Sequence, residues 1–270
     1  MTHSLLLVGC GKMGGAMLDG WLEMGFKPNL IYIVEPHAEA AAALAAYGVT
    51  VAPNVEHLPI DLDPGIVIFA VKPQVMADVA GPYKRYRGPH TVFLSIAAGT
   101  PIKFFEDTLG ADAAVVRAMP NTPAAVGRGI TVICANAQVT DAQRDICQKL
   151  LEAVGEVATV DDESLIDAVT ALSGGGPAYV FLLVECMTQA GIDAGLPADL
   201  AAQLARVTVS GSGELLRQSD DAPGQLRENV TSPGGTTAEA LRVLMADDAW
   251  QPLMTKAIAA ATARSKELAG

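Results

Sequence analysis

The stretch GCGKMG, residues 9–14, limits the fold of this chain more than any other part of the sequence. Its glycines have the spacing G-x-G-x-x-G, directly after the apolar run SLLLV and before the helical pattern AMLDGWLEM. Such glycines allow a tight turn and a close approach of the backbone to a pyrophosphate at the positive end of the helix. The sequence therefore predicts a dinucleotide-binding strand–turn–helix unit, with contacts from Gly9, Gly11, Lys12, Met13 and Gly14.

Glu35 stands at the end of the next apolar run, about 20 residues after the last of these glycines. A charged residue at a strand end is often simply solvated. In a dinucleotide-binding unit, a carboxylate here accepts hydrogen bonds from the adenosine ribose and repels a 2′-phosphate. Both interpretations stay open. The second implies an NAD(P)H cofactor with a weak preference for NADH.

Short apolar runs recur up to about residue 160, separated by segments of helix length. They are SLLLV, LIYIV, GIVIFAV, TVFLSI, AAVVRAM, GITVICA and GEVATV. Continuous apolar strands of this kind are typical of a parallel sheet that is covered on both faces. The first part of the chain is therefore predicted to be an α/β, doubly wound sheet.

After Asp161 the strand-like runs stop and helical patterns take over. Pro177 and Pro197 each stand near the first turn of a helix, and the Ala-rich stretches 197–217 and 249–268 have helical composition. We therefore expect two domains: a Rossmann-type dinucleotide-binding domain over 1–163 and an all-α domain over 164–270.

Composition excludes several function classes. A net charge of −12 argues against nucleic acid as a partner. Four scattered cysteines form no C-x-x-C pair, so neither a metal site nor a disulfide framework is expected. The first residues lack the basic start of a signal peptide. The apolar stretch AYVFLLVECM is shorter than the roughly 18–20 residues that span a bilayer. These features predict a cytoplasmic protein with no membrane partner.

Three loops follow successive strands and should meet at the carboxyl edge of the sheet, where open parallel sheets bind ligands. They are AVKPQ, SIAAG and RAMPNTPAAVG. Each loop alone fits ordinary turn chemistry. Together they predict a pocket for the nicotinamide end of the cofactor.

The stretch TSPGGTT, residues 231–237, interrupts the helical half with residues of poor helix propensity. One interpretation is a capped helix start. The other is an anion site, because free N–H groups at a helix start hold a carboxylate without a cationic side chain. A second glycine-rich joint, ALSGGGPAYVF, lies at 171–181.

These segments, and above all LRENVTSPGGTTAEAL, resemble those of pyrroline-5-carboxylate reductases in order and spacing over essentially the whole chain. The resemblance implies NAD(P)H-dependent reduction of the C=N bond of 1-pyrroline-5-carboxylate to proline, and interlocked homodimers that can gather into a decamer. It makes residues 164–270 the substrate-binding and dimerisation domain. It places the substrate among Ser232, Gly234, Gly235, Thr236 and Thr237, with Thr237 as the candidate catalytic hydroxyl. It also places the nicotinamide end of the cofactor among Ala70, Val71, Lys72, Pro73, Ala97 and Asn121. Two positions depart from the family pattern: Gly175 replaces a usual Ser, and VEPH ends the second strand.

An imine is already electrophilic once protonated, so hydride transfer needs placement more than acid–base groups. The four histidines, His3, His37, His57 and His90, lie outside the motifs and are interpreted as surface or loop residues. The proton on nitrogen comes from solvent or from a hydroxyl such as that of Thr237, and the sequence leaves both open.

Three alternatives remain. A β-hydroxyacid dehydrogenase shares the architecture but needs a lysine on the interdomain helix, and none occurs between Lys149 and Lys256. A related imine reductase would share most of the motifs. A non-catalytic NAD(P)-sensing module explains GCGKMG but leaves TSPGGTT without a role.

A run of small residues lies within one predicted helix. The stretch VSGSGELL places Ser210, Gly211, Ser212 and Gly213 there, where they allow another helix of this chain or of a partner to approach closely.

Overall fold

The computed structural model describes residues 4–269 and divides into two compact units. The first runs up to Gly174 and includes the end of the chain from Thr262, and the second is Gly175–Ala261. A helical run starts at Glu163, but the chain leaves the first unit only after Gly174. The domain boundary expected at residue 163 stays a prediction.

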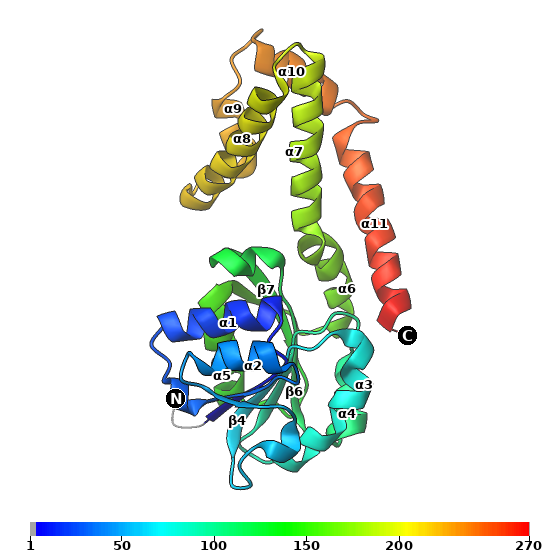
Figure 1. The fold of residues 1–270 in the computed structure, drawn as a ribbon. Helices are drawn as coiled ribbons and strands as arrows, with labels where there is room; N and C mark the ends of the chain where they lie inside the picture. The colour runs from blue at the N-terminus through cyan, green and yellow to red at the C-terminus, as the bar shows by residue number, and fades with distance from the viewer. Residues whose placement is uncertain (1–3, 270) are drawn as a thin grey trace. The chain divides into compact units, whose positions relative to one another are not determined.

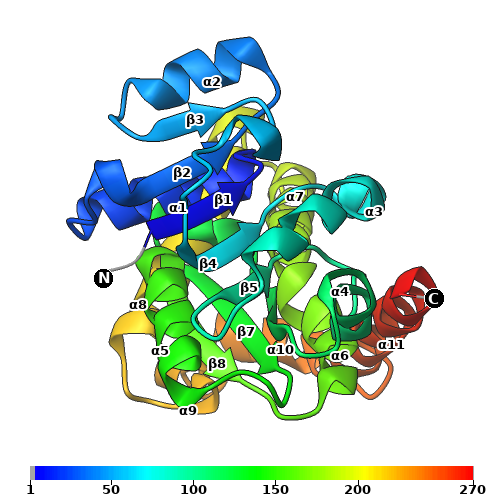
Figure 2. The same cartoon turned by 90° about the horizontal axis from the view of Figure 1, so that it is seen from below.

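The first unit is built on one eight-stranded sheet of order β3-β2-β1-β4-β5-β6-β7-β8 (Figure 2). The α/β class is thereby confirmed. All strands pair in parallel except β6 and β7, which are antiparallel. The strands are β1 Ser4–Val8, β2 Ile31–Val34, β3 Thr50–Ala52, β4 Pro64–Phe69, β5 Val92–Ser95, β6 Ala114–Met119, β7 Gly129–Ala135 and β8 Gly155–Thr159.

Helices cover both faces of this sheet, which explains why its central strands are mainly apolar (Figure 1). Along β1, Leu5 and Leu7 point into one core, whereas Leu6 and Val8 point into the other. The first core is closed by α1 Lys12–Glu23, α2 Ala38–Ala45 and α5 Asp141–Leu151; the second by α3 Met76–Val79, α4 Ile102–Leu109 and α6 Ile166–Val169.

Short helical turns join these elements. The 3-10 turns are η1 Pro28–Leu30, η2 Val55–His57, η3 Pro73–Val75, η4 Gly81–Tyr86, η5 Thr122–Val126, η6 Glu152–Val154 and η7 Glu163–Leu165, and a π-turn, η8, spans Thr170–Gly174.

Close packing fixes α1 on the sheet. Trp21 is fully buried, and its Nε1–H donates to the Leu150 carbonyl at 2.8 Å. One residue earlier, a Cβ at Gly20 would lie 2.6 Å from the Ala153 carbonyl oxygen. The α1 helix therefore rests backbone against backbone on η6, which a larger residue would prevent.

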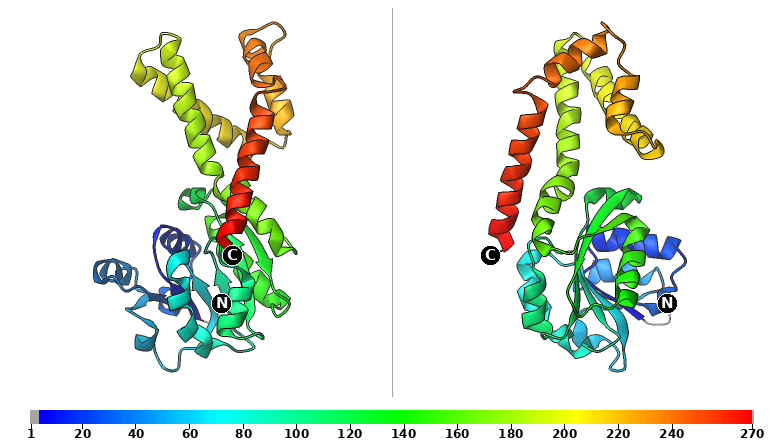
Figure 3. Two further views of the ribbon diagram at one scale, coloured as in Figure 1. Left: turned by 90° about the vertical axis from the view of Figure 1, so that its right-hand side faces the viewer. Right: turned by 180° about the vertical axis from the view of Figure 1, so that it is seen from behind.

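The second unit is helical. It holds α7 Gly176–Asp193, α8 Ala198–Gln218, α9 Pro223–Asn229, α10 Thr236–Leu244 and most of α11 Trp250–Ala269 (Figure 3). The α7 and α8 helices pack where Gly191 faces Ala201, because a Cβ at Gly191 would lie 3.2 Å from Ala201 Cβ. The last residues of α11 belong to the first unit, where Ser265 Oγ donates to Asp167 Oδ1 at 2.7 Å.

Large apolar side chains of the second unit face outward. Phe181, Val207 and Leu253 are each more than half exposed. The helical run Glu163–Asp193 is long and apolar enough to cross a membrane by length and composition, which differs from the expectation drawn from AYVFLLVECM alone. The reason is that η7, α6, η8 and α7 follow one another almost without a break and extend that stretch.

The packing of α1 generates a stability prediction. Gly20→Ala should lower the free energy of unfolding by about 1–3 kcal/mol, although Ala is the better helix former, because its Cβ would overlap the Ala153 carbonyl. Gly15→Ala in the same helix is the matched control, since a Cβ there meets no atom within 4 Å. Gly15→Ala should raise the free energy of unfolding by about 0.5–1 kcal/mol. Urea unfolding without coenzyme measures the free energy of unfolding of both variants. If the two substitutions change it equally, the overlap with the Ala153 carbonyl is not the cause.

Candidate functional site

The glycine-rich turn between β1 and α1 packs tightly against the residues after β4. Gly9 has a φ of +84°, in the left-handed region, and a Cβ there would lie 2.7 Å from Val71 Cγ1. A Cβ at Gly14 would lie 2.8 Å from the Gly9 carbonyl oxygen and 3.5 Å from Ala70 Cβ. The structure thus brings Gly9, Gly14, Ala70 and Val71 together at the point where the strand order changes direction.

Gly11 has the opposite environment. A Cβ at Gly11 would meet no atom within 4 Å, so the space in front of it is open to a ligand. Gly11 is also the N-cap of α1, whose first turn contains Lys12 and Met13, and no side chain caps this end of the helix. Free amides, a positive helix end and open space fit the pyrophosphate of a dinucleotide.

Glu35 comes directly after β2, and its backbone N–H extends the ladder to the Ala52 carbonyl. The residue is only 8% exposed. Its Oε2 accepts a hydrogen bond from the backbone N–H of Cys10 at 3.3 Å, which ties the end of β2 to the glycine-rich turn. Its Oε1 accepts from the backbone N–H of His37 at 3.1 Å and lies 2.9 Å from His37 Nδ1.

The Cys10 thiol stays neutral beside this carboxylate. Burial, followed by the negative charges of Glu35 and Asp19, raises the pKa of Cys10 to about 12. A thiolate would add a negative charge next to the expected pyrophosphate. The protonated thiol adds none.

The remaining residues predicted for the cofactor follow neighbouring strands. Lys72 is exposed and caps η3, which begins at Pro73. Ala97 follows β5, is nearly buried, and donates its N–H to Ser95 Oγ at 3.3 Å. The Ile96 N–H donates to the Phe69 carbonyl, which links the loops after β4 and β5. These residues therefore lie along one edge of the sheet.

Asn121, after β6, uses its side chain within the first unit. Its Oδ1 accepts from the Ile130 N–H at 3.0 Å, and its Nδ2 donates to the Ser173 carbonyl at 3.3 Å. The amide therefore joins β7 and the π-turn η8. A cofactor at this position would contact either the backbone of Asn121 or the part of its amide that these two hydrogen bonds leave unused.

A partly buried ion pair at this edge was missed by the sequence analysis. Arg117 Nη1 lies 2.7 Å from Glu163 Oε1, and the Arg117 side chain is 5% exposed. The same oxygen accepts from the Ile102 N–H at 2.8 Å, so it joins β6 and the start of α4 to η7. An arginine within an apolar run was the available signal, since a buried guanidinium needs a partner.

In the second unit, TSPGGTT forms a tight turn followed by a helix. The Gly235 N–H donates to the Ser232 carbonyl at 3.0 Å, Pro233 occupies the second position of the turn, and Gly234 has a φ of +68°. These are the features of a type II turn, which explains the Pro-Gly pair. The α10 helix begins at Thr236 and has no side-chain cap.

The hydroxyls of this segment are accessible. Ser232 and Thr236 are exposed and Thr237 is half-buried. No hydrogen bond among the described residues involves the hydroxyl of Thr237. The capped-helix interpretation therefore does not account for this residue, and its hydroxyl remains available to a ligand.

The second glycine-rich joint lies where the π-turn η8 ends and α7 begins. Gly175 is the N-cap of α7, and no side chain caps that helix. In the first unit, Ser173 Oγ is buried and has no hydrogen-bond partner among the described residues. π-turns inside helices are frequent at functional sites.

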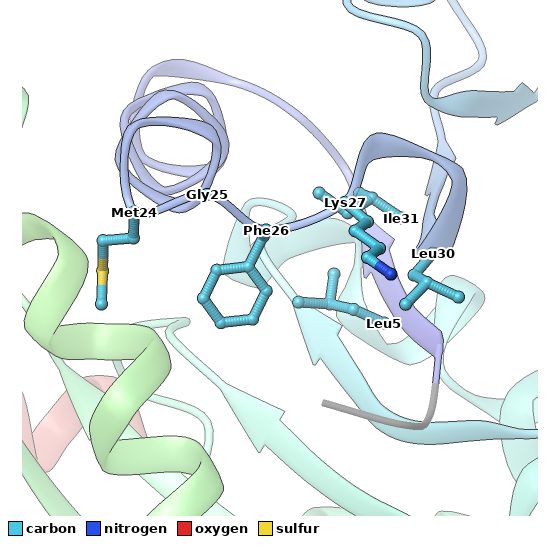
Figure 4. A pocket seen from close by; sticks show the side chains of 7 residues that line it. All are labelled: Leu5, Met24, Gly25, Phe26, Lys27, Leu30 and Ile31. Carbon is cyan, nitrogen blue, oxygen red and sulfur yellow. The ribbon is translucent and has the colours of Figure 1, made fainter.

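Residues 4–269 contain no group of His, Cys, Asp and Glu that could hold a metal ion. A cavity of about 260 Å³ lies at the opposite, amino-terminal end of β1 (Figure 4). Lys27 is the only charged residue among those that line it, which are Leu5, Met24, Gly25, Phe26, Lys27, Leu30 and Ile31. None of the predicted site residues borders this cavity.

Two family models match the chain. Residues 163–268 match the model described as pyrroline-5-carboxylate reductase dimerisation. Residues 4–99 match the model described as NADP oxidoreductase coenzyme F420-dependent. Together they cover the glycine-rich turn, Glu35, Ala97 and the whole of α7 to α10.

Relatives and solved structures agree with these matches. The pyrroline-5-carboxylate reductase of Pseudomonas aeruginosa is 39% identical, over 99% of this chain and 97% of its own length. That of Glycine max is 35% identical, over 99% of this chain and 96% of its own. The structure from Coxiella burnetii has a TM-score of 0.94 at 32% identity, with both chains fully covered.

A structure from Plasmodium falciparum, described with NADP bound, has a TM-score of 0.82 at 30% identity and covers 100% of this chain and 99% of its own. Likeness of this extent, over both units, leaves no segment of the fold unmatched. This chain belongs to the pyrroline-5-carboxylate reductase family.

Proposed function

We propose that this protein reduces the C=N bond of 1-pyrroline-5-carboxylate with NAD(P)H and releases L-proline. A dinucleotide crevice in one unit and an accessible turn-plus-helix anion site in the other carry this proposal. A sensor that binds only NAD(P) would have no use for the second feature, and a β-hydroxyacid dehydrogenase would need a lysine that is missing between Lys149 and Lys256.

The first unit holds the coenzyme. The amides after Gly11 bind the pyrophosphate, while Gly9 and Gly14 let the turn fold tightly enough to present them. Residues at the edge of the sheet surround the nicotinamide end, namely Ala70, Val71, Lys72, Pro73, Ala97 and Asn121. When bound, the coenzyme supplies the hydride that reduces the imine carbon.

The second unit holds the substrate carboxylate. The uncapped start of α10 offers N–H groups and the positive end of the helix dipole. Gly234 and Gly235 let the backbone come close, and the hydroxyls of Ser232, Thr236 and Thr237 add donors. The proton for the imine nitrogen comes either from the Thr237 hydroxyl or from solvent. Because Gly175 has no side chain, it contributes at most its backbone to the site.

Glu35 favours NADH. Its carboxylate is buried and accepts from the N–H groups of Cys10 and His37, so turning it aside would break these hydrogen bonds. Held in place, it accepts from the ribose hydroxyls of NADH and repels the 2′-phosphate of NADPH. NADP is named for the matched family model and for the Plasmodium structure, which are statements about those proteins rather than about this chain.

The active protein is a homodimer whose copies join through the helical unit, and these dimers can gather into a decamer. Exposed apolar side chains of α7, α8 and α11 need a cover, and a second copy supplies one rather than a membrane. Free cysteines at positions 10, 134, 147 and 186 are typical of a reducing compartment, which supports a cytoplasmic location.

The reaction itself gives the first test. The purified protein should oxidise NADH or NADPH only when pyrroline-5-carboxylate is present, with equimolar proline as the product. Absorbance at the nicotinamide band measures the NAD(P)H that is oxidised, and proline analysis measures the product that is formed. Coenzyme binding without turnover across several cyclic imines would reject the reductase in favour of the sensor.

Thr237 gives the second test. Thr237→Ala should lower kcat/KM for the imine by about 1–3 kcal/mol of transition-state stabilisation and leave coenzyme affinity nearly unchanged, because it removes one hydroxyl donor. Thr237→Ser is the matched control, since it keeps the hydroxyl and should retain most activity. If Thr237→Ala has the wild-type kcat/KM, the Thr237 hydroxyl has no role in the reaction.

Glu35 gives the third test. Glu35→Ser should raise KM for NADH and lower it for NADPH, because it removes both the ribose acceptor and the repulsion. Glu39→Ser is the control, since Glu39 is an exposed acid in the first turn of α2. A wild-type preference for NADPH of tenfold or more, about 1.4 kcal/mol, would mean that the carboxylate does not face the ribose.

Assembly gives the fourth test. Light scattering should give at least a dimer at concentrations where the enzyme is active. Gly211→Trp should weaken assembly but leave coenzyme binding intact, because a Cβ at Gly211 meets no atom of its own chain within 4 Å. An active monomer would count against the proposed interface.

A further inference from the structure

The two oxygens of the Glu35 carboxylate are used unequally. Oε1 lies 3.1 Å from the His37 backbone nitrogen and 2.9 Å from His37 Nδ1, so residue 37 surrounds this oxygen. Oε2 has one protein donor, the Cys10 N–H at 3.3 Å. An ionised carboxylate oxygen accepts about two hydrogen bonds. Oε1 is therefore saturated, and Oε2 keeps capacity for a ligand.

The tautomer of His37 follows from its partner. A carboxylate only accepts hydrogen bonds, so the Nδ1 atom that faces Oε1 carries the proton. The other ring nitrogen, Nε2, is then free of any role toward Glu35. Protonation of the ring would leave the Nδ1–H donor in place.

This hydrogen bond is the interaction that holds the ring. The His37 side chain is 82% exposed, so packing fixes its position far less than it fixes the buried Glu35. The backbone between the two residues is restrained by Pro36, whose φ is locked. The short chain Glu35-Pro36-His37 thus places a backbone donor and a ring donor on the same oxygen.

We propose that His37 is a positioning residue for coenzyme selection. By occupying Oε1 it keeps the carboxylate from rotating and leaves Oε2 toward the ribose hydroxyls of NADH. The same hydrogen bond opposes the movement of Glu35 that the 2′-phosphate of NADPH would require. This inference rests on the proposed role of Glu35 in binding the ribose.

Three substitutions separate this role from a structural one. H37A removes the ring donor, H37N returns an N–H near the place of Nδ1, and H37Q returns it near the place of Nε2. The dissociation constants of NADH and NADPH are measured by fluorescence titration without substrate, so the result does not depend on turnover. The midpoint of thermal unfolding and the steady-state constants are measured alongside.

H37A and H37Q should weaken the binding of NADH three- to tenfold and leave the binding of NADPH unchanged or slightly tighter. In the steady state, the KM for NADH should change rather than kcat. H37N should restore the NADH affinity. A merely structural role would weaken both coenzymes alike and lower the unfolding midpoint. An unchanged NADH to NADPH ratio in H37A, or an H37N variant as weak as H37A, overturns the proposal.

A second background distinguishes this inference from the assignment of Glu35. In E35S, adding H37A should change neither dissociation constant further, because His37 acts only through the carboxylate. An effect of H37A that persists in E35S means direct contact with the coenzyme and overturns the proposal. If E35S itself leaves the ratio unchanged, the ribose role of Glu35 fails, and the inference about His37 fails with it.

Discussion

The proposed coenzyme site at the edge of the sheet depends on the close approach of the Gly9 backbone to Val71. Any side chain at Gly9 would lie 2.7 Å from Val71 Cγ1, and its φ of +84° is one that other residues rarely adopt. This contact lets the chain turn from β1 into α1 directly beside β4. Because the strand order changes direction there, the uncapped amides of α1 lie at the point where open parallel sheets bind ligands. The position of Glu35 follows from the same turn, since Oε2 accepts from Cys10.

The ion pair of Arg117 and Glu163 joins several segments along the same edge of the sheet. Glu163 accepts from Arg117 on β6 and from the first amide of α4, so one carboxylate joins the strand, the loop after β5 and the start of the interdomain helical run. Replacing a buried pair with apolar residues is often neutral for stability, whereas removing one partner is costly. We infer that the pair matters here for the position of three segments rather than for net stability.

Much of the first unit was predictable because both faces of its sheet are buried. Seven apolar runs became strands with small shifts at their ends, and the glycine spacing located the turn between β1 and α1. Two features were not predictable. The strand β3 has only three residues, too few to give a pattern. The antiparallel direction of β7 is also invisible, because a run buried on both faces reads the same in either direction.

The site was predictable where backbone geometry decides it and not where side chains pair over long distances. Gly9, Gly11 and Gly234 announce turns by their identity. Arg117 and Glu163 are 46 positions apart, and no local pattern connects them. Asn121 has the right place in the loop, yet its amide holds Ile130 and Ser173. An exposed histidine such as His37 gives no periodic signal at all, so only the fold reveals that its ring meets Glu35.

The two units differ in how much apolar surface they bury within themselves. The first contains two extensive cores, so its crevice is supported by the same chain. In the described part of the second, between Gly175 and Ala261, only Ala201 and Ala205 are buried. Two alanines bury too little apolar area to offset the entropy of ordering five helices. The turn before α10 therefore gains little support from apolar burial within its own unit, whereas the glycine-rich turn between β1 and α1 rests on the first core.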